Sequence, residues 1–303
     1  MGTEPDIPRG WNLSRVSLLT GRRYLITGGT SGLGRASAKG LMSLGAHVTV
    51  TARNVAKGEA MVAAREANDV LDMDLGNLSS VRAAAARVSV PYDVVILNAG
   101  IMWTPYALTV DGFESQLGVN HLGHFAFAGL LRDRIQERLV TVSSLYQRYG
   151  SFGDGSVDEI RARCWGEVPY SARDAYGDSK LANMLFTHEV ERRRTSSGPQ
   201  FIAVAAHPGW SSTNLFGAGR GVAGAITTLA SRILAQGASR GALPQLCAAT
   251  LPGLRGGEYF GPRGPGELRG APEIVQPVDR AFDAERAANL WRVSEELTGV
   301  EWE

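Results

Sequence analysis

Two side chains with acid/base chemistry stand one helical turn apart beyond the middle of the chain. Tyr176 and Lys180 lie in the segment Ala175–Phe186. At i, i+4 spacing, both side chains lie on one face of a helix. An ammonium group beside a phenol favours the phenolate, and each unit by which the pKa falls below ~10 needs about 1.4 kcal/mol. The pair predicts a phenol that exchanges protons near neutral pH, although the spacing alone occurs by chance on many helices.

A glycine-rich turn stands near the start of the chain. The segment Thr27–Gly34 carries Gly28, Gly32 and Gly34 in the spacing G-x-x-x-G-x-G. Glycine permits positive φ and close backbone approach, and a helix that follows offers its N-terminal amides to an anion. Between a predicted strand and a predicted helix, the pattern indicates a cradle for the pyrophosphate of a dinucleotide; the alternative is a turn that binds nothing.

The end of the second predicted strand, Thr51–Asn54, indicates which dinucleotide binds. An acidic residue at this place suits the ribose hydroxyl of NAD, whereas an arginine suits the 2′-phosphate of NADP. Arg53 has no acidic neighbour before Glu59. The sequence therefore favours NADP(H) over NAD(H), and the alternative for Arg53 is a solvated surface side chain. Ser31 in the glycine turn adds a hydroxyl group but no second positive charge.

The elements that must position these residues alternate along the chain. Short runs that are apolar on both faces predict strands of a buried parallel sheet. Their alternation with helical patterns predicts an α/β fold, a Rossmann-like, doubly wound parallel sheet with helices on both faces. The predicted strands are 24–27, 48–51, 70–73, 94–97, 139–142 and 201–205, and the predicted helices are 34–44, 55–67, 78–88, 113–134 and 176–194.

No repeat or low-complexity linker divides the chain, so residues 1–303 are predicted to form a single domain. The cofactor half spans about 20–145 and the catalytic and substrate half about 146–303. Two stretches depart from the alternation, the polar Gln147–Arg173 and the segment Gly209–Leu251, which follows a strand end. Because ligands of such sheets bind at the carboxyl ends of strands, both stretches are candidates for a substrate lobe; the alternative is surface insertions.

The composition narrows the classes of function. The chain is 44% hydrophobic and 20% charged, as is usual for a soluble protein. A formal net charge of +1 gives no global field that would attract nucleic acid or an anionic membrane. Cys164 and Cys247 have neither metal-binding nor redox spacing, so no metal site and no disulfide framework are predicted.

The same residues bear on location. The polar stretch Met1–Gly10 lacks the apolar core of a signal peptide. Charged and polar residues interrupt Gly217–Ala249, so we expect no integral membrane segment there, while an amphipathic surface helix that touches a membrane stays open. Together with the low cysteine usage, these features predict a cytoplasmic protein.

Taken together and in this order, the motifs resemble those of the short-chain dehydrogenase/reductase family, over nearly the whole chain. Thr27–Gly34 is similar to the family's T-G-x-x-x-G-x-G, and Tyr176–Lys180 to its Y-x-x-S-K. The other matching segments are Asp74-Leu75, Asn98-Ala99-Gly100 with Leu97 in place of the usual first asparagine, Val142–Ser144, and His207–Gly209.

The resemblance implies hydride transfer between a nicotinamide and a carbonyl or alcohol carbon. Tyr176 is then the general acid or base, and Lys180 tunes the phenol and hydrogen-bonds the nicotinamide ribose. Ser144, rather than Ser143, polarises the substrate oxygen, because strand alternation sends the two hydroxyl groups to opposite sides. Asn120 anchors a water in the proton relay to Lys180.

The residues expected to hold the cofactor come from the same motifs. Asp74 and Leu75 contact the adenine ring, and the segment of Asn98 ends the fourth strand beside the cofactor. The full set is Thr27, Gly28, Ser31, Gly32, Leu33, Gly34, Arg53, Asp74, Leu75, Asn98, Ala99, Gly100, Tyr176, Lys180, Pro208, Gly209 and Thr213.

Within the family, Asp111–Glu114 and Gly118–Phe125 are similar to the branch of retinol dehydrogenases and WW-domain oxidoreductases; protochlorophyllide reductases are more distant. The long separation of Ser144 from Tyr176 supports this branch. The second of these segments contains His121 and His124 at i, i+3 spacing, for which a packing or interface role is favoured over metal binding, since no third ligand is visible.

The expected partner is a small, apolar carbonyl or alcohol, with Tyr146 and Trp210 as candidate walls of its pocket. No nucleic acid partner is expected. A homodimer or homotetramer through residues 113–134 and 174–194 is one expectation, although some members of this branch are monomers. Two alternatives remain for function: reduction of a C=C bond on the same fold, and a non-catalytic NADP-binding regulatory protein.

Overall fold

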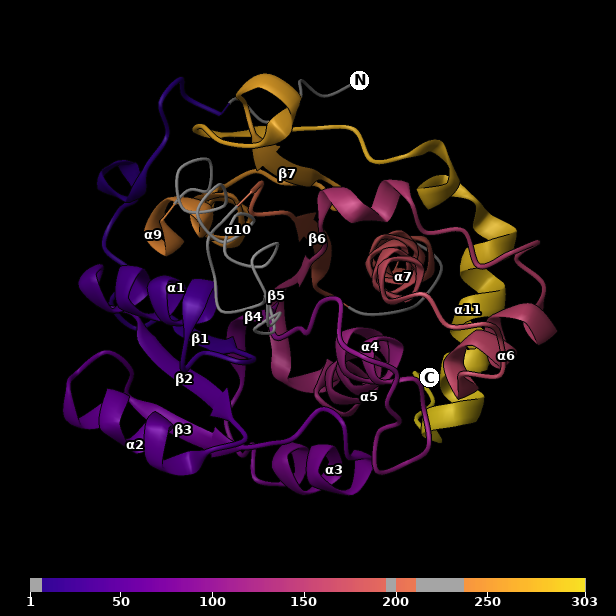
Figure 1. Ribbon diagram of the computed structural model, residues 1–303. Helices are drawn as coiled ribbons and strands as arrows, with labels where there is room; N and C mark the ends of the chain where they lie inside the picture. The colour runs from indigo at the N-terminus through magenta and orange to yellow at the C-terminus, as the bar shows by residue number, and fades with distance from the viewer. Residues whose placement is uncertain (1–6, 195–199, 211–236, 303) are drawn as a thin grey trace, which may run out of the picture.

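The computed structural model describes residues 7–194, 200–210 and 237–302 of the chain (Figure 1). The strands are β1 (Arg23–Ile26), β2 (His47–Ala52), β3 (Asp69–Asp72), β4 (Tyr92–Leu97), β5 (Ile135–Val142), β6 (Ile202–Ala206), β7 (Tyr259–Pro262) and β8 (Pro272–Ile274). The helices are α1 (Gly32–Ser43), α2 (Val55–Ala63), α3 (Leu78–Ala86), α4 (Ser115–Leu117), α5 (Gly123–Leu130), α6 (Val157–Trp165), α7 (Ala172–Arg194), α9 (Ala238–Gly241), α10 (Leu243–Thr250) and α11 (Ala284–Thr298).

The described strands form one sheet in the order β3-β2-β1-β4-β5-β6-β7-β8. Neighbouring strands run parallel except β7 and β8, which are antiparallel. The order confirms the predicted doubly wound α/β fold. The chain leaves β1 for β2 on one side and later returns to β4 on the other, so the strand order reverses between β1 and β4. Ligands of such sheets bind beyond the carboxyl ends of the strands at this point.

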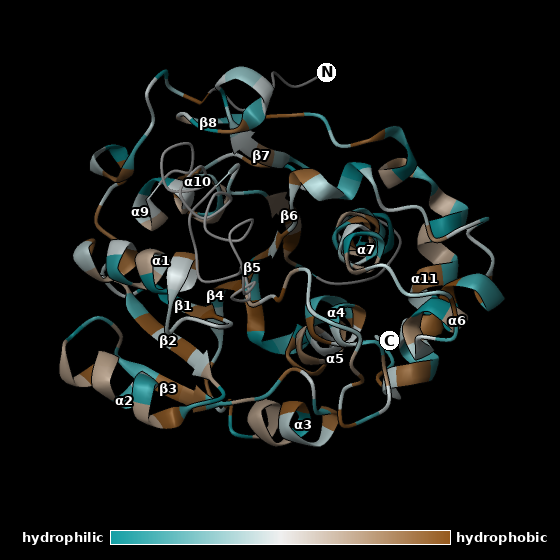
Figure 2. Ribbon diagram, in the orientation of Figure 1, coloured by the Kyte–Doolittle hydropathy of each residue, from teal (hydrophilic) through white to brown (hydrophobic). Residues whose placement is uncertain are grey.

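Helices cover both faces of the sheet (Figure 1). On one face, α1, α2 and α10 pack on the strands and share a core that includes Leu41, Met61 and Leu246. On the other face, α3, α5, α7 and α11 enclose a core rich in aromatic rings, among them Phe125 and Trp291. Figure 2 shows the central strands as mostly hydrophobic, in keeping with burial from both sides.

Local sequence signals explain where several helices begin. The side chains of Asn54, Asn77, Ser156 and Asp283 each accept a backbone N–H in the first turn of α2, α3, α6 and α11. Such caps satisfy amide groups that have no partner inside the helix. The helix after the glycine turn has no such side-chain cap, a point that matters for the site.

The structure corrects three details of the sequence-based fold. The stretch Gln147–Arg173, predicted as a polar loop, contains α6 and ends as α7 begins at Ala172. The helix predicted at 113–134 begins at Ser115 and is interrupted by a π-helical turn, Gly118–Leu122, and its last residues belong to the approach to β5. The C-terminal helix α11, for which no pattern was singled out, packs along α7.

Candidate active site

The glycine turn lies between the carboxyl end of β1 and α1, where the strand order reverses. Gly28 and Gly32 have φ of +64° and +51°, values that favour glycine. A Cβ on Gly34 would lie 2.5 Å from the carbonyl oxygen of Gly28, so this position also needs a residue without a side chain. The glycines predicted from the sequence are therefore required by the backbone itself.

This turn has the features that a dinucleotide needs. Ser31 is exposed at the start of α1 and makes no side-chain hydrogen bond to the helix. The first amides of α1 are thus left for an anionic group, as the positive end of the helix dipole favours. Gly29 packs tightly on Val50, and a Cβ on Gly29 would lie 2.4 Å from Val50 Cγ1. The turn therefore has no side chain at this position, on the side of β2. The residues present fit a pyrophosphate cradle.

Two neighbouring segments border this cradle. Arg53 is exposed directly after β2 and forms no ion pair within the described parts of the chain. Thr51, two residues earlier, accepts a hydrogen bond from the backbone N–H of Gly28 at 3.2 Å, which ties β2 to the turn. After β3, the carboxylate of Asp74 accepts the backbone N–H of Gly76, and Leu75 is buried against Gly123.

A buried polar network fixes the turn against β4. Asn98 donates through Nδ2 to the carbonyl oxygen of Thr27 at 2.8 Å, and its Oδ1 accepts from Gln245 of α10 at 3.1 Å. The hydroxyl of Thr27 accepts the backbone N–H groups of Asn98 and Ala99 at 2.9 and 3.0 Å. Asn98 and Thr27 therefore hold the glycine turn in place from the side of β4. Gln245 was not found by sequence reasoning, because its contact spans 147 positions.

Tyr176 and Lys180 lie together on α7, both buried, with the Lys180 Nζ 5.7 Å from the centroid of the Tyr176 ring. Nζ donates to the carbonyl oxygen of Val142 at 3.0 Å, at the end of β5. Burial lowers the pKa of Lys180 to about 8. Burial also raises the pKa of Tyr176 to about 12, against the effect of a hydrogen bond with Ser144.

These directions correct the expectation of a phenol that is acidic near neutral pH. The sequence argument relied on the ammonium group and left out desolvation, which is the largest cause of the shift here. In this structure Tyr176 is a protonated hydroxyl group at neutral pH. Removing the proton needs a further positive charge nearby, such as an oxidised nicotinamide carries.

The two serines after β5 have different partners. Ser144 lies near the Tyr176 hydroxyl, whose pKa it lowers, and accepts the backbone N–H of Tyr146 at 3.2 Å. Ser143 is buried and donates to the carbonyl oxygen of Lys180 at 2.8 Å. The structure thus brings Ser144 together with Tyr176, while Ser143 holds the backbone of α7.

Asn120 lies fully buried in the π-helical turn, a kind of irregularity that is frequent at functional sites. Its Oδ1 accepts the N–H of Ile101 at 2.8 Å, and its Nδ2 donates to the carbonyl of Ile101 and to Ser179 Oγ, both at 2.9 Å. Both amide hydrogens are thereby used. A Cβ on Gly100 would lie 3.3 Å from Asn120 Oδ1 and 3.5 Å from Lys180 Nζ, so these groups meet beside Gly100.

An aromatic wall, formed by the rings of Trp103, Tyr146 and Tyr149, lies beside Tyr176. The Tyr146 ring is 5.6 Å from that of Tyr176, and 5.3 Å from those of Trp103 and Tyr149. The sequence argument named Tyr146 but not Trp103, which follows the Asn98–Gly100 motif and has φ of +53°. The wall places aromatic ring surface beside Tyr176, together with the Lys180 ammonium group and the Arg173 guanidinium, which lies 6.0 Å from the Tyr146 ring.

A buried glutamine holds this loop in place. Gln116 accepts the backbone N–H of Trp103 through Oε1 at 2.8 Å and donates through Nε2 to the Tyr170 hydroxyl and the carbonyl of Ala172. Tyr170 in turn donates to the carbonyl of Thr104 at 2.6 Å. The unfavourable conformation of Trp103 is thus maintained by contacts to the start of α7.

The turn after β6 contains the expected Pro208 and Gly209. Gly209 has φ of +67°, and its N–H donates to His207 Nδ1 at 3.2 Å. His207 Nε2 lies 3.0 Å from Glu267, which also pairs with Arg148 at 2.6 Å. This bridge joins the turn to the residues after Ser144. Trp210 is 37% exposed at this rim, and Thr213, predicted to contact the cofactor, lies outside the described residues.

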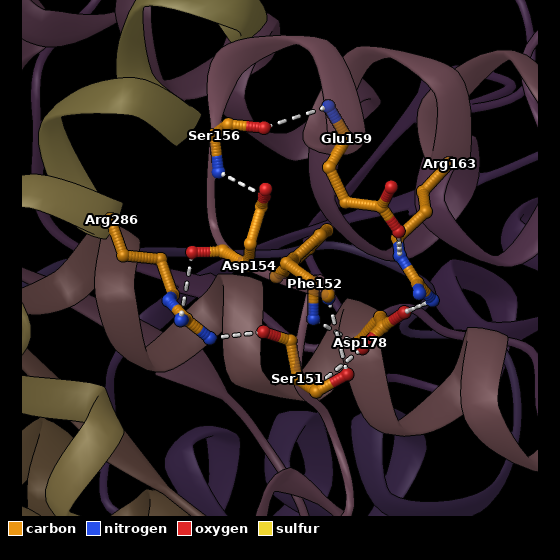
Figure 3. A network of polar contacts seen from close by, with 9 residues as sticks. Ser151, Phe152, Asp154, Ser156, Glu159, Arg163, Asp178 and Arg286 are labelled. Carbon is orange, nitrogen blue, oxygen red and sulfur yellow. Dashed lines mark hydrogen bonds and ion pairs between the residues drawn. The ribbon is translucent and has the colours of Figure 1, made fainter.

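The segment before α7 is held against this helix by the buried Asp178, as Figure 3 shows. The carboxylate accepts the backbone N–H groups of Ser151 and Phe152 at 2.7 and 3.1 Å and pairs with Arg163 of α6 at 2.8 Å. Burial raises the pKa of Asp178, opposed by these hydrogen bonds and by the guanidinium. Arg286 of α11 donates to the carbonyl oxygen of Ser151 from the other side.

Comparison with known proteins agrees with this geometry. The short chain dehydrogenase family model matches residues 22–155. Retinol dehydrogenase 14 of Mus musculus is 34% identical over 93% of this chain and 87% of its own, and a chloroplastic short-chain dehydrogenase of Brassica napus is 33% identical over 90% and 87%. The crystal structure of an uncharacterized protein from Mycobacterium paratuberculosis superposes with a TM-score of 0.81 at 41% identity, over 97% of this chain and 99% of that one.

The chain belongs to the short-chain dehydrogenase/reductase family, and its relatives lie in the retinol dehydrogenase-like branch. It is an NAD(P)-dependent oxidoreductase of alcohol and carbonyl groups. Through the described parts of the chain, no helix has the length and apolar character that crossing a membrane requires. Nor do His, Cys, Asp and Glu side chains gather in threes or more as a metal site would need, within those same residues.

Proposed function

We propose that this enzyme transfers hydride between NADP(H) and the carbonyl or alcohol carbon of a small apolar molecule, with Tyr176 as the general acid or base. The observation that carries the proposal is the buried Tyr176 side chain, which lies beside Ser144 and on the same helix face as Lys180. A hydroxyl pair of this kind is what a substrate oxygen needs as it gains or loses a proton.

The roles of the residues follow from their contacts. Ser144 donates to the substrate oxygen and orients it toward Tyr176, whose proton completes reduction. A phenol with a pKa near 12 keeps that proton at neutral pH, which suits the reductive direction. Lys180, held by the carbonyl of Val142, supplies positive charge next to the phenol once the proton has left. A bound nicotinamide supplies or accepts the hydride.

The cofactor would lie along the carboxyl ends of β1, β2 and β4. The amides at the start of α1 suit its pyrophosphate, and the segments after β3 and β4, with Asp74, Leu75 and Gly100, suit its adenosine and nicotinamide portions. The exposed guanidinium of Arg53 is available for a 2′-phosphate, for which a planar, bidentate donor is well suited. This supports NADP(H) over NAD(H).

The substrate class follows from the aromatic wall. Trp103, Tyr146 and Tyr149 offer large apolar surfaces next to the reacting hydroxyl groups. A pocket lined in this way gains free energy by burying apolar rather than charged molecules. The sheet also takes strands from both halves of the sequence, which supports a single domain as the working unit.

Purified protein tests the proposal directly. We expect NADPH oxidation that depends on apolar aldehydes or ketones, with the corresponding alcohols as products. Products in which a C=C bond has been reduced would instead support a C=C reductase. Tight NADPH binding without turnover on a broad panel would support a non-catalytic, cofactor-binding protein.

Arg53 provides a test of cofactor choice. For Arg53→Ser we expect kcat/KM with NADPH to fall about tenfold or more, because charge-assisted hydrogen bonds to the 2′-phosphate are lost, while kcat/KM with NADH changes little. Arg87→Ser is a matched control, since Arg87 is another exposed arginine, at the end of α3. Equal losses with both cofactors would contradict the assignment of Arg53.

A further inference from the structure

Two buried histidines in one helical region, His121 and His124, have different hydrogen-bond partners in this structure. His121 lies 2.8 Å through Nε2 from Ser294 Oγ of α11 and packs on Phe125 and Phe186. His124 instead faces the site: its Nε2 lies 2.8 Å from the hydroxyl of Thr27, and its Nδ1 lies 3.1 Å from the carbonyl oxygen of Asn120. Only the second histidine connects residues of the cofactor cradle and the catalytic side.

The neighbours of His124 decide where its proton lies. The Thr27 hydroxyl already accepts two backbone N–H groups, from Asn98 and Ala99, so its own hydrogen points to His124 Nε2. The carbonyl oxygen of Asn120 can only accept. His124 is therefore neutral with its hydrogen on Nδ1. Burial, which lowers its pKa to about 4, agrees with the neutral form.

From Asn120 the contacts continue to the catalytic helix. Asn120 Nδ2 donates to Ser179 Oγ at 2.9 Å, and Ser179 Oγ donates to the carbonyl oxygen of Tyr176 at 2.8 Å. Every member of this path is buried, so each unpaired group would be costly. The path begins at the turn that binds the cofactor and ends at the residue that moves the proton.

We propose that His124 is a positioning residue that fixes the cofactor turn at Thr27 relative to Asn120 and, through Asn120 and Ser179, to Tyr176. It acts through its neighbours and touches neither substrate nor cofactor. The inference rests on the proposed function for the identity of the cofactor. It assigns to His124 a role that the spacing of two histidines in the sequence did not reveal.

Two measurements test this proposal. The first is ¹⁵N NMR of histidine-labelled wild-type protein at pH 7, which should show His124 protonated at Nδ1 and unprotonated at Nε2, with no titration down to about pH 5. A hydrogen on Nε2, or a charged ring at pH 7, would overturn the proposal. This measurement needs neither substrate nor turnover.

The second measurement compares variants of the two histidines by NADPH affinity and by kcat and KM. For His124→Phe we expect NADPH affinity and kcat each to fall about tenfold or more, because two buried groups lose their partner. His124→Gln keeps a donor and an acceptor and should recover part of both losses. His121→Phe should lower the thermal midpoint yet leave NADPH affinity and kcat within about twofold of the wild type.

The outcomes separate the two proposals. Equal losses in His124→Phe and His121→Phe would show that both histidines only fill the core, and would overturn the role of His124. If His124→Phe fails to fold, the NADPH affinity and kcat of His124→Gln relative to the wild type, together with the NMR result, decide instead. Wild-type protein that binds no NADPH would refute the proposed cofactor, and it would leave the proton position on His124 as a separate result.

Discussion

The two sides of the active site are built from different kinds of group. On the cofactor side, the cradle consists of glycines, amides and the neutral side chains of Thr27 and Asn98. On the catalytic side, α7 carries the ionisable groups Lys180 and Asp178 into the core, and Asp178 is paired with Arg163. The cradle thus needs little charge of its own, whereas the catalytic helix holds several charges out of water.

This difference follows from what each side must do. A dinucleotide brings its own negative charge, so a glycine-rich turn with amides left for an anion suffices to hold it. A proton donor must be shielded and held in place, and its partners are buried with it at a cost in desolvation. We therefore expect substitutions on the catalytic side to affect folding stability, and those on the cofactor side to affect mainly binding.

The largest effect on stability is expected at Arg163. Arg163→Ala leaves the buried carboxylate of Asp178 without its guanidinium, so the free energy of unfolding at pH 7 should fall by about 3 kcal/mol. The loss should shrink as the pH is lowered toward 5, because the Asp178 pKa, already raised by burial, rises further in the variant and protonation then removes the unpaired charge. Chemical denaturation at both pH values measures this.

Arg161 of the same helix is the matched control. It pairs with Glu296 and Asp158, which are both exposed, so Arg161→Ala should change stability little. If Arg161→Ala and Arg163→Ala lose similar amounts, the ion pair with Asp178 is not what fastens α6 to the catalytic helix. That result would contradict the expectation that buried charge on the catalytic side affects folding stability.

A smaller effect of opposite sign is expected at Lys180. Burial lowers its pKa from 10.5 to about 8, so the ammonium form at pH 7 destabilises the folded state. Lys180→Met should therefore raise the free energy of unfolding by about 1–2 kcal/mol at pH 7 while turnover is lost. The sign follows because the folded state binds its proton more weakly than the unfolded state does.

The pH dependence of this difference is its check. Between pH 8 and 10.5 the folded wild type loses the Lys180 proton before the unfolded chain does, so the free energy of unfolding of the wild type rises. The difference in free energy of unfolding between Lys180→Met and the wild type therefore becomes smaller. Denaturation of both proteins at pH 7, 8.5 and 10 measures it. A stability difference that stays constant with pH, or a Lys180→Met variant less stable than the wild type at pH 7, would contradict the claim that the buried Lys180 ammonium group destabilises the folded state.

The sequence predicted the cofactor half well, because its signals are local. The glycine turn, the following helix and the alternating buried strands each lie within a few residues, and the sheet order confirms the fold that they indicate. Caps such as Asn54 and Asn77 lie where the helices begin. Sequence motifs also singled out Tyr176, Lys180 and Ser144, and the structure places these side chains near one another, while their roles stay predictions.

What could not be predicted depends on contacts between distant segments. The pairs His124–Thr27 and Gln245–Asn98 join residues 97 and 147 positions apart, and no short motif records them. The pKa of Tyr176 was misjudged because desolvation is a property of the folded environment rather than of residue spacing. Helix α6 was missed since its sequence is largely polar, and its packing depends on partners far along the chain, namely α11 and the buried carboxylate of Asp178.

The most direct test of the account is the comparison of Tyr176→Phe with the wild type in two assays on the same preparation, NADPH affinity and NADPH-dependent carbonyl reduction. Removing one hydroxyl group should lower the rate of reduction by roughly 10²–10⁴-fold, because no other group supplies the proton, while NADPH affinity stays within about threefold. A Tyr176→Phe enzyme that retains more than about a tenth of wild-type turnover would contradict the assignment of Tyr176 as the proton donor.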